Sequence, residues 1–286
     1  MDELSDSVLA HLREAVDLPD LSQTRYEWIG QLGRGGMGTV HLVRDTQLDR
    51  EVALKVVESH SAAEAHTTAR LEHPGIVPVH DSGTLPDGRL YFAMKRIEGI
   101  RLDQYRDTGP AHAELLRVFL RACEPVAYAH AHGVIHCDLK PQNIMTGKFG
   151  EVLVLDWGAA KNLDPAGPIA GTPDFIAPEQ QAGNPTPLSD IFSLGRTLEA
   201  LCGPGVRRAL MAIAQKAAAT NPADRYPSVE ALMQDLRRYM DGEPVQAYPE
   251  PLLEKAARIL TRNQTLVLLI VSYIALRVLL FLFIRR

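Results

Sequence analysis

The sequence predicts an α+β fold in which strands come first and helices follow. Strand-like segments lie at 26–43, 52–55 and 90–99, where apolar residues alternate or run together. From Ala113 to His132 the apolar residues recur at helical spacing, which predicts a buried helix. A polar loop at 134–143 follows this helix directly, and its residue types point to chemistry.

Length and composition limit the class of protein. A chain of 286 residues can hold one two-lobed domain with appendages, and 46% hydrophobic residues permit a sizeable core. The net charge of -5 provides no general basic surface, so we expect no nucleic-acid partner. Cys123, Cys137 and Cys202 lack metal or disulfide spacing and suit a reducing compartment. We find no internal repeat and expect no signal peptide.

An acidic segment at 1–24 opens the chain. Leu4, Val8, Leu12 and Val16 recur at roughly helical spacing before Pro19, which predicts a short amphipathic helix. Packing on the folded domain and docking of a partner are both open as its role.

A glycine-rich stretch, Leu32-Gly-Arg-Gly-Gly-Met-Gly-Thr-Val40, lies between two strand-like segments. Backbone can approach a triphosphate closely only where no Cβ intervenes, and glycine tolerates the dihedral angles of such a turn. A flexible hairpin is the alternative. A dinucleotide-binding motif should open a helix, whereas residues 41–43 continue as a strand.

The loop at 134–143 has the composition of a catalytic loop. Val134 and Ile135 should fix it to a core, while Asp138, Lys140 and Asn143 should face one pocket. These three side chains offer a hydrogen-bond acceptor, a positive charge and a neutral metal ligand, which are the groups that phosphoryl transfer needs. The alternative is a turn in which the Asp and Asn side chains bond only their own backbone.

This loop resembles the H-R-D-x-K-x-x-N element of bacterial, eukaryotic-like (Hanks-type) serine/threonine protein kinases, with Cys137 in place of the arginine. Short motifs are weak evidence singly and strong evidence in series. Further family elements follow in the family's order over about 26–241: the glycine-rich loop, Val52–Lys55, the segment 64–78, Asp156–Gly158, Ala177–Glu179, Asp190–Gly195 and Asn221–Arg225.

The resemblance implies a two-lobed protein kinase fold with a small β-rich N-lobe and a larger helical C-lobe. The stretch between Gly195 and Asn221 is shorter than usual and has room for the rest of one helix and for another at 206–219. We therefore expect the family's helix αG to be missing. The predicted division is an N-terminal extension at 1–24, an N-lobe at 25–97, a C-lobe at 98–242, a juxtamembrane linker at 243–265 and a transmembrane helix at 266–284.

The resemblance also implies the cofactors, ATP with Mg²⁺ or alternatively Mn²⁺. Asp138 would orient and deprotonate the acceptor hydroxyl, Lys140 would neutralise the moving phosphoryl group and Lys55 would hold the α- and β-phosphates. Asn143 and Asp156 would bind the metal, because Mg²⁺ demands oxygen ligands. The residues implied in nucleotide binding are Leu32, Gly33, Gly35, Gly36, Gly38, Val40, Ala53, Lys55, Met94 and Ile97.

Glu64 aligns with the glutamate that pairs with the phosphate-binding lysine in the family. Nine positions separate it from Lys55, fewer than is usual, so we expect the intervening helix to be shortened. Ser61 lies three residues before Glu64, so the carboxylate could instead close a capping box. We favour the ion pair with Lys55.

The segment between Gly158 and Ala177 bears on regulation. In the family, the arginine before the catalytic Asp pairs with a phosphorylated residue in this segment. Cys137 replaces that arginine, and Thr172, the only hydroxyl-bearing residue of the segment, matches the family's Gly-Thr-Pro anchor near Asp138. We therefore predict activity without phosphorylation of this segment.

Several other residues match family positions with structural roles. Asp190 should brace the catalytic loop from behind, and Arg225 should pair with Glu179. Trp157 is larger than the usual Phe while Thr68 is smaller than the usual Leu, which suggests an exchange of volume within one apolar stack. His130 and His132 have no further metal ligands at useful spacing, so we expect surface or capping roles.

The stretch 266–284 is apolar apart from Ser272, Tyr273 and Arg277. As a helix it would be about 28 Å long, close to the hydrocarbon thickness of a bilayer. Arg277 would cost roughly 3 kcal/mol, whereas the Leu, Ile, Val and Phe residues together contribute roughly -6 kcal/mol. We expect a single-pass membrane helix; a buried soluble helix is the alternative.

Cytosolic ATP sets the expected orientation, with the kinase in the cytoplasm and the anchor at its C-terminal end. The expected partners are the lipid bilayer and protein substrates with Ser or Thr acceptors. Arg277 is a candidate for contact with an in-membrane partner or for self-association. Two other classes stay open: a nucleotide-binding pseudokinase scaffold at the membrane and a small-molecule phosphotransferase.

Overall fold

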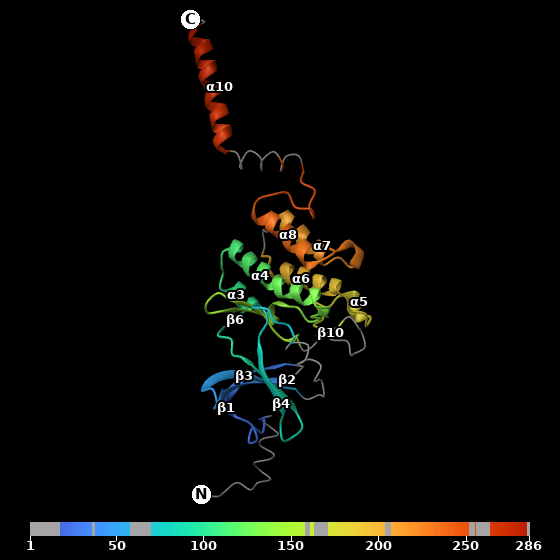
Figure 1. Ribbon diagram of the computed structural model, residues 1–286. Helices are drawn as coiled ribbons and strands as arrows, with labels where there is room; N and C mark the ends of the chain where they lie inside the picture. The colour runs from blue at the N-terminus through green and yellow to red at the C-terminus, as the bar shows by residue number, and fades with distance from the viewer. Residues whose placement is uncertain are drawn as a thin grey trace.

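The computed structural model of the chain describes residues 18–35, 38–57, 70–157, 161–162, 171–203, 207–251, 255 and 264–284 (Figure 1). These residues form a strand-rich N-lobe and a larger helical C-lobe, as the sequence predicts. Ile76 and Val77, just before the last two strands of the N-lobe, are buried, and Ile76 forms a parallel bridge with Val154 of the C-lobe.

The N-lobe is built on one antiparallel sheet of five strands in the order β1-β2-β3-β5-β4. Its central strand is buried from Val52 to Val57, because a strand covered on both faces carries a continuous apolar run. The strands are β1 (Tyr26–Gly35), β2 (Gly38–Asp45), β3 (Arg50–Val57), β4 (Val79–Thr84) and β5 (Leu90–Lys95).

Strand β1 carries two irregularities. Its pairing with β2 skips Ile29 and Leu32, and both side chains are exposed. A bulge adds a residue to one strand and breaks the alternation of inward and outward side chains. Leu32 therefore points to solvent beside the glycine-rich turn.

The C-lobe places short strands beside the N-lobe and helices beyond them (Figure 1). Near the N-lobe lie β6 (Gly99–Arg101), α3 (Leu102–Asp107), β7 (Val134–Ile135), η1 (Pro141–Asn143), β8 (Ile144–Gly147), β9 (Val152–Val154) and β10 (Lys161–Asn162). The helices are α4 (His112–Ala131), α5 (Pro178–Gln181), α6 (Pro187–Leu201), α7 (Arg208–Ala217), the 3-10 turn η3 (Pro222–Asp224) and α8 (Val229–Met240).

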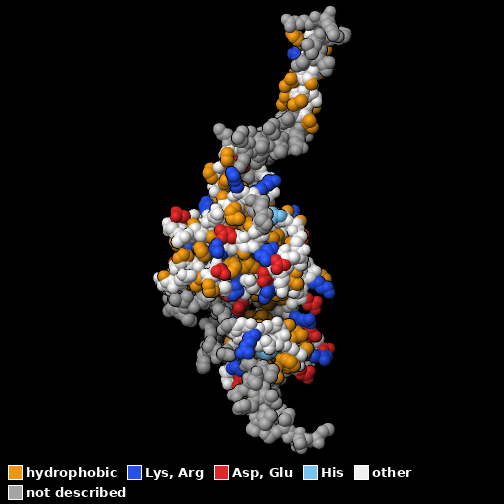
Figure 2. All heavy atoms as spheres, turned by 180° about the vertical axis from the view of Figure 1, so that it is seen from behind, with side chains coloured by type: hydrophobic (Ala, Val, Ile, Leu, Met, Phe, Trp, Pro, Cys, Tyr) orange, Lys and Arg blue, Asp and Glu red, His pale blue; other side chains and the backbone are white. Residues whose placement is uncertain are grey.

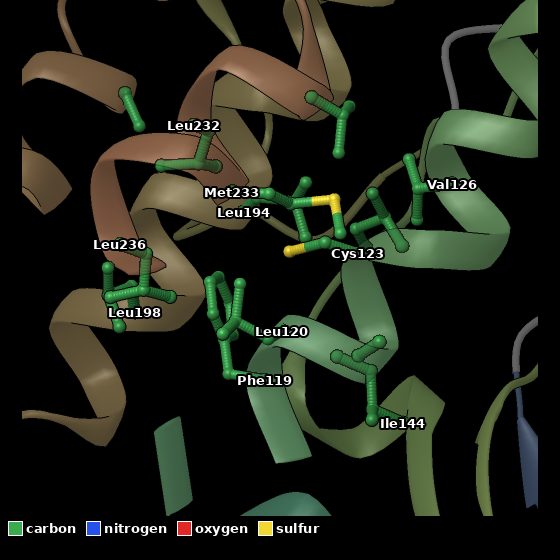
Figure 3. Packing of buried hydrophobic residues seen from close by; sticks show 14 of the residues in the cluster. Phe119, Leu120, Cys123, Val126, Ile144, Leu194, Leu198, Leu232, Met233 and Leu236 are labelled. Atoms are coloured by element: carbon green, nitrogen blue, oxygen red, sulfur yellow. The ribbon is translucent and has the colours of Figure 1, made fainter. Parts of the chain in front are cut away.

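The main core lies where α4, α6 and α8 meet. Phe119 and Cys123 of α4 are fully buried among side chains of α6 and α8, including Leu194, Leu198 and Leu236 (Figure 3). A buried Phe of this kind contributes about 3 to 5 kcal/mol relative to Ala. This core fixes α4, whose C-terminal end leads directly into the catalytic loop.

The region expected to lack αG contains one helix among its described residues. Between α6 and η3, at 202–203 and 207–221, the structure has α7 at Arg208–Ala217, close to the predicted helix at 206–219. The predicted N-terminal helix falls largely on residues 1–17, which lie outside the described residues. Leu21 packs against the core of the N-lobe.

The chain after α8 folds back onto the C-lobe. Asp235 of α8 accepts hydrogen bonds from the Tyr226 hydroxyl at 2.7 Å and from the backbone N–H groups of Gln246 and Ala247 at 2.6 and 3.0 Å. Val245 is buried beside them. The first residues of the predicted linker are thus bound to the C-lobe.

The C-terminal helix α10 spans Gln264–Ile284, where the sequence predicts a transmembrane helix at 266–284. Leu268, Ile270 and Ile274 are each more than half exposed, and apolar side chains cover the visible described part of this helix (Figure 2). Across the residues that the structure describes, no helix combines the length and apolarity needed to cross a membrane.

Candidate active site

Asp190 of α6 holds the catalytic loop from behind, as predicted. It is fully buried, and its two carboxylate oxygens accept the backbone N–H groups of His136 at 2.8 Å and Cys137 at 2.9 Å. His130 Nε2 lies 2.7 Å from the same carboxylate. Burial opposes ionisation, but the bonds from His130 and His136 keep the pKa of Asp190 below its ordinary value.

This contact corrects the role expected for His130. The sequence suggests a surface or capping residue, whereas the structure makes His130 the partner of a buried carboxylate at the end of α4. His132 meets the expectation, because it is exposed and its Nδ1 lies 2.8 Å from the Tyr128 carbonyl oxygen in the last turn of that helix.

The structure brings together the polar residues of the catalytic loop. Lys140 Nζ donates to Asp138 Oδ2 at 2.8 Å, and Asn143 Nδ2 donates to the same oxygen at 3.0 Å. Thr172 donates its hydroxyl to Asp138 Oδ1 at 2.8 Å and accepts from Lys140 Nζ at 2.7 Å. Thr172 therefore lies at Asp138, as the family's anchor residue should.

Lys55, the predicted phosphate-binding lysine, forms an ion pair with Asp156, a predicted metal ligand. Lys55 Nζ of β3 lies 2.6 Å from Asp156 Oδ1, although the two residues belong to different lobes. Burial would raise the pKa of Asp156, but the charge and hydrogen bond of Lys55 lower it below its ordinary value. Glu64, the partner of Lys55 that the sequence analysis favours, lies outside the described residues.

Asp156 has a strained backbone. Its φ of 59° falls in the left-handed region, which costs about 1 to 3 kcal/mol for a residue with a Cβ. The next residue, Trp157, is buried, and its Nε1 donates to the Val154 carbonyl oxygen at 3.2 Å. The centroid of its ring lies 4.6 Å from the centroid of the His136 ring. Thr68, its proposed contact, lies outside the described residues.

The residues implied in nucleotide binding come from neighbouring strands. Val40 of β2 pairs with Lys55, and Ala53 of β3 pairs with Met94 of β5. Ile97 follows β5, Gly33 and Gly35 belong to β1 with the exposed Leu32, and Gly36 lies outside the described residues.

Gly38 shows why the turn between β1 and β2 requires glycine. Its φ is 133°, and a Cβ at this position would lie 2.1 Å from the backbone oxygen of Val56. No side chain fits that space, so the close approach of the start of β2 to β3 depends on this residue.

Asp156 and Asn143 offer suitable donors for a hard cation. A backbone hydrogen bond of 2.8 Å from Leu155 N to Asn143 O joins the two segments. Asn143 uses its amide nitrogen to bond Asp138, so its side-chain oxygen is the atom left for a metal, and both donors are oxygens as Mg²⁺ or Mn²⁺ prefers. The described residues contain no group of three His, Cys, Asp or Glu that could hold a metal.

The structure also contains the last ion pair predicted from the sequence, between Glu179 and Arg225. Arg225 donates to both carboxylate oxygens of Glu179, at 2.7 and 2.9 Å, and its side chain is fully buried. Burial opposes ionisation of Glu179, whereas the bonds from Arg225 and Ser189 lower its pKa below the ordinary value.

One residue of the site, Gln180, could not be predicted from the sequence. Gln180 of α5 is buried, and its Nε2 donates to the Cys137 carbonyl oxygen at 2.6 Å. It belongs to none of the motifs considered, and a glutamine beside Glu179 gives no signal that it faces the catalytic loop.

The fold has two lobes, an ion pair between Lys55 and Asp156 joins them, and an Asp-x-Lys-x-x-Asn loop lies in the C-lobe. Together these features define one class of protein. Residues 26–224 match the protein kinase domain family, and the chain belongs to that family.

The chain is also similar to several serine/threonine-protein kinases. The chain is 32% identical to serine/threonine-protein kinase PknD of Protochlamydia amoebophila, over 80% of this chain and 31% of that protein. It is also 32% identical to PknD of Chlamydia trachomatis serovar D, over 81% of this chain and 33% of the relative. It is 34% identical to PknB of Mycolicibacterium smegmatis, over 80% and 45%. The chain thus spans less than half the length of these relatives.

Proposed function

We propose that this chain is an ATP-dependent protein kinase that phosphorylates Ser and Thr hydroxyls of proteins. The observation that carries the proposal is the environment of the Thr172 hydroxyl, which donates to Asp138 and accepts from Lys140. The two side chains are therefore spaced to hold a hydroxyl between an acid and a cation. The names of the relatives, which are serine/threonine-protein kinases, support the same substrate class.

The residues would divide the work in the following way. Bound ATP with Mg²⁺ or Mn²⁺ would supply the phosphoryl group and part of the neutralising charge. Asp138 would orient the acceptor hydroxyl and take its proton, while Lys140 would stabilise negative charge beside it. Lys55 would bind phosphate oxygens, and Asp156 with Asn143 would hold the metal.

A transfer assay with radiolabelled ATP tests this function. We expect label on a generic protein substrate and on the chain itself, and a fall of about 10² to 10⁴ in kcat for Asp138→Asn. Asp241→Asn, at an exposed carboxylate beyond α8, is the matched control and should behave like the wild type. Nucleotide binding without any transfer by the wild type would favour the pseudokinase scaffold, and ATP consumption without labelled protein would favour a small-molecule phosphotransferase.

The proposal includes activity without phosphorylation of the segment before Ala177. Cys137 is buried and has no cationic group with which to bind a phosphate, and Thr172 is engaged by Asp138 and Lys140. Pairing of β10 with β7 holds the start of the segment, at Lys161 and Asn162. Phosphatase treatment verified by mass spectrometry should leave kcat unchanged; inactivation by removal of phosphate from this segment would contradict the proposal.

We also propose that α10 attaches the kinase to a membrane as a single-pass anchor, with the catalytic domain in the cytoplasm. A helix that is apolar on all sides needs either a core or lipid around it, and the described apolar side chains of α10 are largely exposed. Arg277 Nε donates to the Tyr273 hydroxyl at 3.1 Å, one turn away, so its charge has a partner on its own helix.

Cell fractionation tests the anchor. The full chain should stay in the membrane pellet after alkaline extraction, whereas a chain ending at residue 263 should be released. Release of both would contradict attachment through α10. Crosslinking of the wild type and Arg277→Leu in membranes tests the second role of this residue, because unchanged partners and self-association would exclude it as their contact.

A further inference from the structure

Gln180 joins two segments of the active site that are far apart in sequence. The residue is 2% exposed, and its Nε2 lies 2.6 Å from the carbonyl oxygen of Cys137, 43 residues away. Cys137 immediately precedes Asp138. A buried amide on α5 therefore contacts the backbone that carries the residue proposed as the base.

The backbone of Cys137 needs to be held. Its φ is 67°, in the left-handed region that residues with a Cβ rarely adopt. Asp190 accepts the N–H of Cys137 at 2.9 Å, and Gln180 donates to its C=O at 2.6 Å. The peptide group between Cys137 and Asp138 contains that carbonyl, so its orientation, and with it the direction of the Asp138 side chain, depends on Gln180.

Gln180 also lies against the segment that carries Thr172. A Cβ on Gly171 would lie 3.0 Å from Gln180 Nε2, so the Gly171 backbone packs directly on this amide. The next residue, Thr172, donates its hydroxyl to Asp138 Oδ1. One side chain thus lies between the loop that bears Asp138 and the segment that bears its hydrogen-bond donor.

We propose that Gln180 is a positioning residue that holds Asp138 and the Thr172 segment in the arrangement needed for phosphoryl transfer. The inference rests on the proposed function and deepens it. Cys137 stands where an arginine could bind a phosphorylated residue and so connect the catalytic loop to the segment that carries Thr172. The hydrogen bond from Gln180 connects the same two segments without phosphorylation, because an amide donates a hydrogen bond without carrying a charge.

Steady-state kinetics of Gln180→Met test the proposal. Methionine is similar in length but cannot donate, so the buried Cys137 carbonyl would lose its partner. We expect kcat to fall about 10- to 100-fold through misplacement of Asp138. The KM for ATP should change less than about twofold, because Lys55 and Asp156 come from other segments. Gln181→Met, at the exposed neighbouring position of α5, is the matched control and should keep the wild-type kcat.

A second substitution separates positioning from general packing. Glycine adopts a positive φ without strain, so Cys137→Gly removes part of the need for a restraint. We expect Cys137→Gly to restore part of the kcat lost in Gln180→Met. A defect that is unchanged in the double variant would count against positioning and favour a purely structural role.

Hydrogen exchange provides a test that needs no activity. The backbone amides within residues 136–143 should exchange faster in Gln180→Met than in the wild type. Their exchange rates in Gln181→Met should equal those of the wild type. An inactive wild type would refute the proposed function, and exchange alone would then decide the role of Gln180. Wild-type exchange together with wild-type kcat would overturn the proposal. If Gln180→Met loses its native circular dichroism, Gln180→Asn, which draws the amide back by one methylene, replaces it with the same outcomes.

Discussion

Lys55 and Asp156 form an ion pair between the lobes, with Nζ 2.6 Å from Oδ1. The pair joins β3 of the N-lobe to the segment after β9 of the C-lobe. Burial favours the neutral form of Asp156, and Lys55 overcomes this effect and lowers its pKa. The pair therefore keeps the carboxylate ionised, which is the form that binds a cation.

The pair makes stability depend on pH in a defined direction. A carboxyl group with a lowered pKa in the folded protein stabilises it fully above the pKa of the unfolded chain, and this contribution is lost as pH falls through the folded-state value. We expect Lys55→Met to lower the free energy of unfolding by about 1 to 3 kcal/mol at pH 7. The difference from the wild type should shrink below about pH 4, where unfolded Asp becomes protonated.

Urea denaturation at several pH values measures this effect. Lys95→Met is the matched control, since Lys95 ends the neighbouring strand β5 and is exposed. Its effect should be small and independent of pH. A destabilisation by Lys55→Met that is the same at pH 7 and in acid would show that Asp156 gains nothing from the lysine.

Gly38 provides a second prediction. Because its φ is 133° and a Cβ would lie 2.1 Å from the Val56 oxygen, Gly38→Ala should displace the start of β2 from β3. We expect a loss of about 1 to 3 kcal/mol in stability and a raised KM for ATP. Gly30→Ala in β1 meets no atom within 4 Å and serves as the control, with a melting temperature near that of the wild type. Equal melting temperatures for the two variants would contradict the prediction.

Much of the candidate site could be predicted because the family motifs keep their residues close in sequence. Asp138, Lys140 and Asn143 lie within six positions, and local spacing alone indicates that they share one pocket. Asp190, Glu179 and Arg225 were placed only through the resemblance, since nothing local pairs residues that lie tens of positions apart. Their contacts in the structure agree with that placement.

The contacts that could not be predicted have no periodic or motif signal. Gln180 bonds the catalytic loop directly, and His130 bonds Asp190, which holds that loop; both hydrogen bonds form only after the helices pack. The bulges at Ile29 and Leu32 depend on the register between β1 and β2, which a strand's own sequence does not specify. The hydrogen bonds of Asp235 to residues 246 and 247 likewise arise from a turn of the chain back onto α8.

The pair of Arg225 and Glu179 leads to a third prediction. Arg225→Lys should lower the free energy of unfolding by about 2 to 4 kcal/mol. Lysine cannot make two parallel hydrogen bonds to Glu179, so this partly buried carboxylate would lose one of its bonds. The effect should diminish in acid, since the pKa of Glu179 is lowered in the folded protein and its contribution is lost as pH falls through that value. Arg238→Lys, on α8, is the control. Equal unfolding midpoints for the two lysine variants would count against the pair.

The end of the folded domain gives the last prediction. The sequence places the C-lobe boundary at residue 242, yet Asp235, fully buried, receives two of its three hydrogen bonds from residues 246 and 247. A chain that ends at 242 would leave a buried carboxylate with the Tyr226 hydroxyl alone and would uncover the site that Val245 fills. Hydrogen bonds to a charged group each contribute about 1.5 to 3 kcal/mol.

We therefore expect a chain ending at 242 to unfold at a lower urea concentration than one ending at 251, by about 3 kcal/mol or more in free energy. Asp235→Asn in the longer chain should reproduce part of the loss, because an amide oxygen accepts two N–H groups less strongly than a carboxylate does. Asp241→Asn in the same chain should have little effect, since that side chain is exposed at the end of α8. Equal stability of the two truncated chains would mean that residues 243–251 add nothing to the fold, and the carboxylate of Asp235 would then need another explanation for its burial.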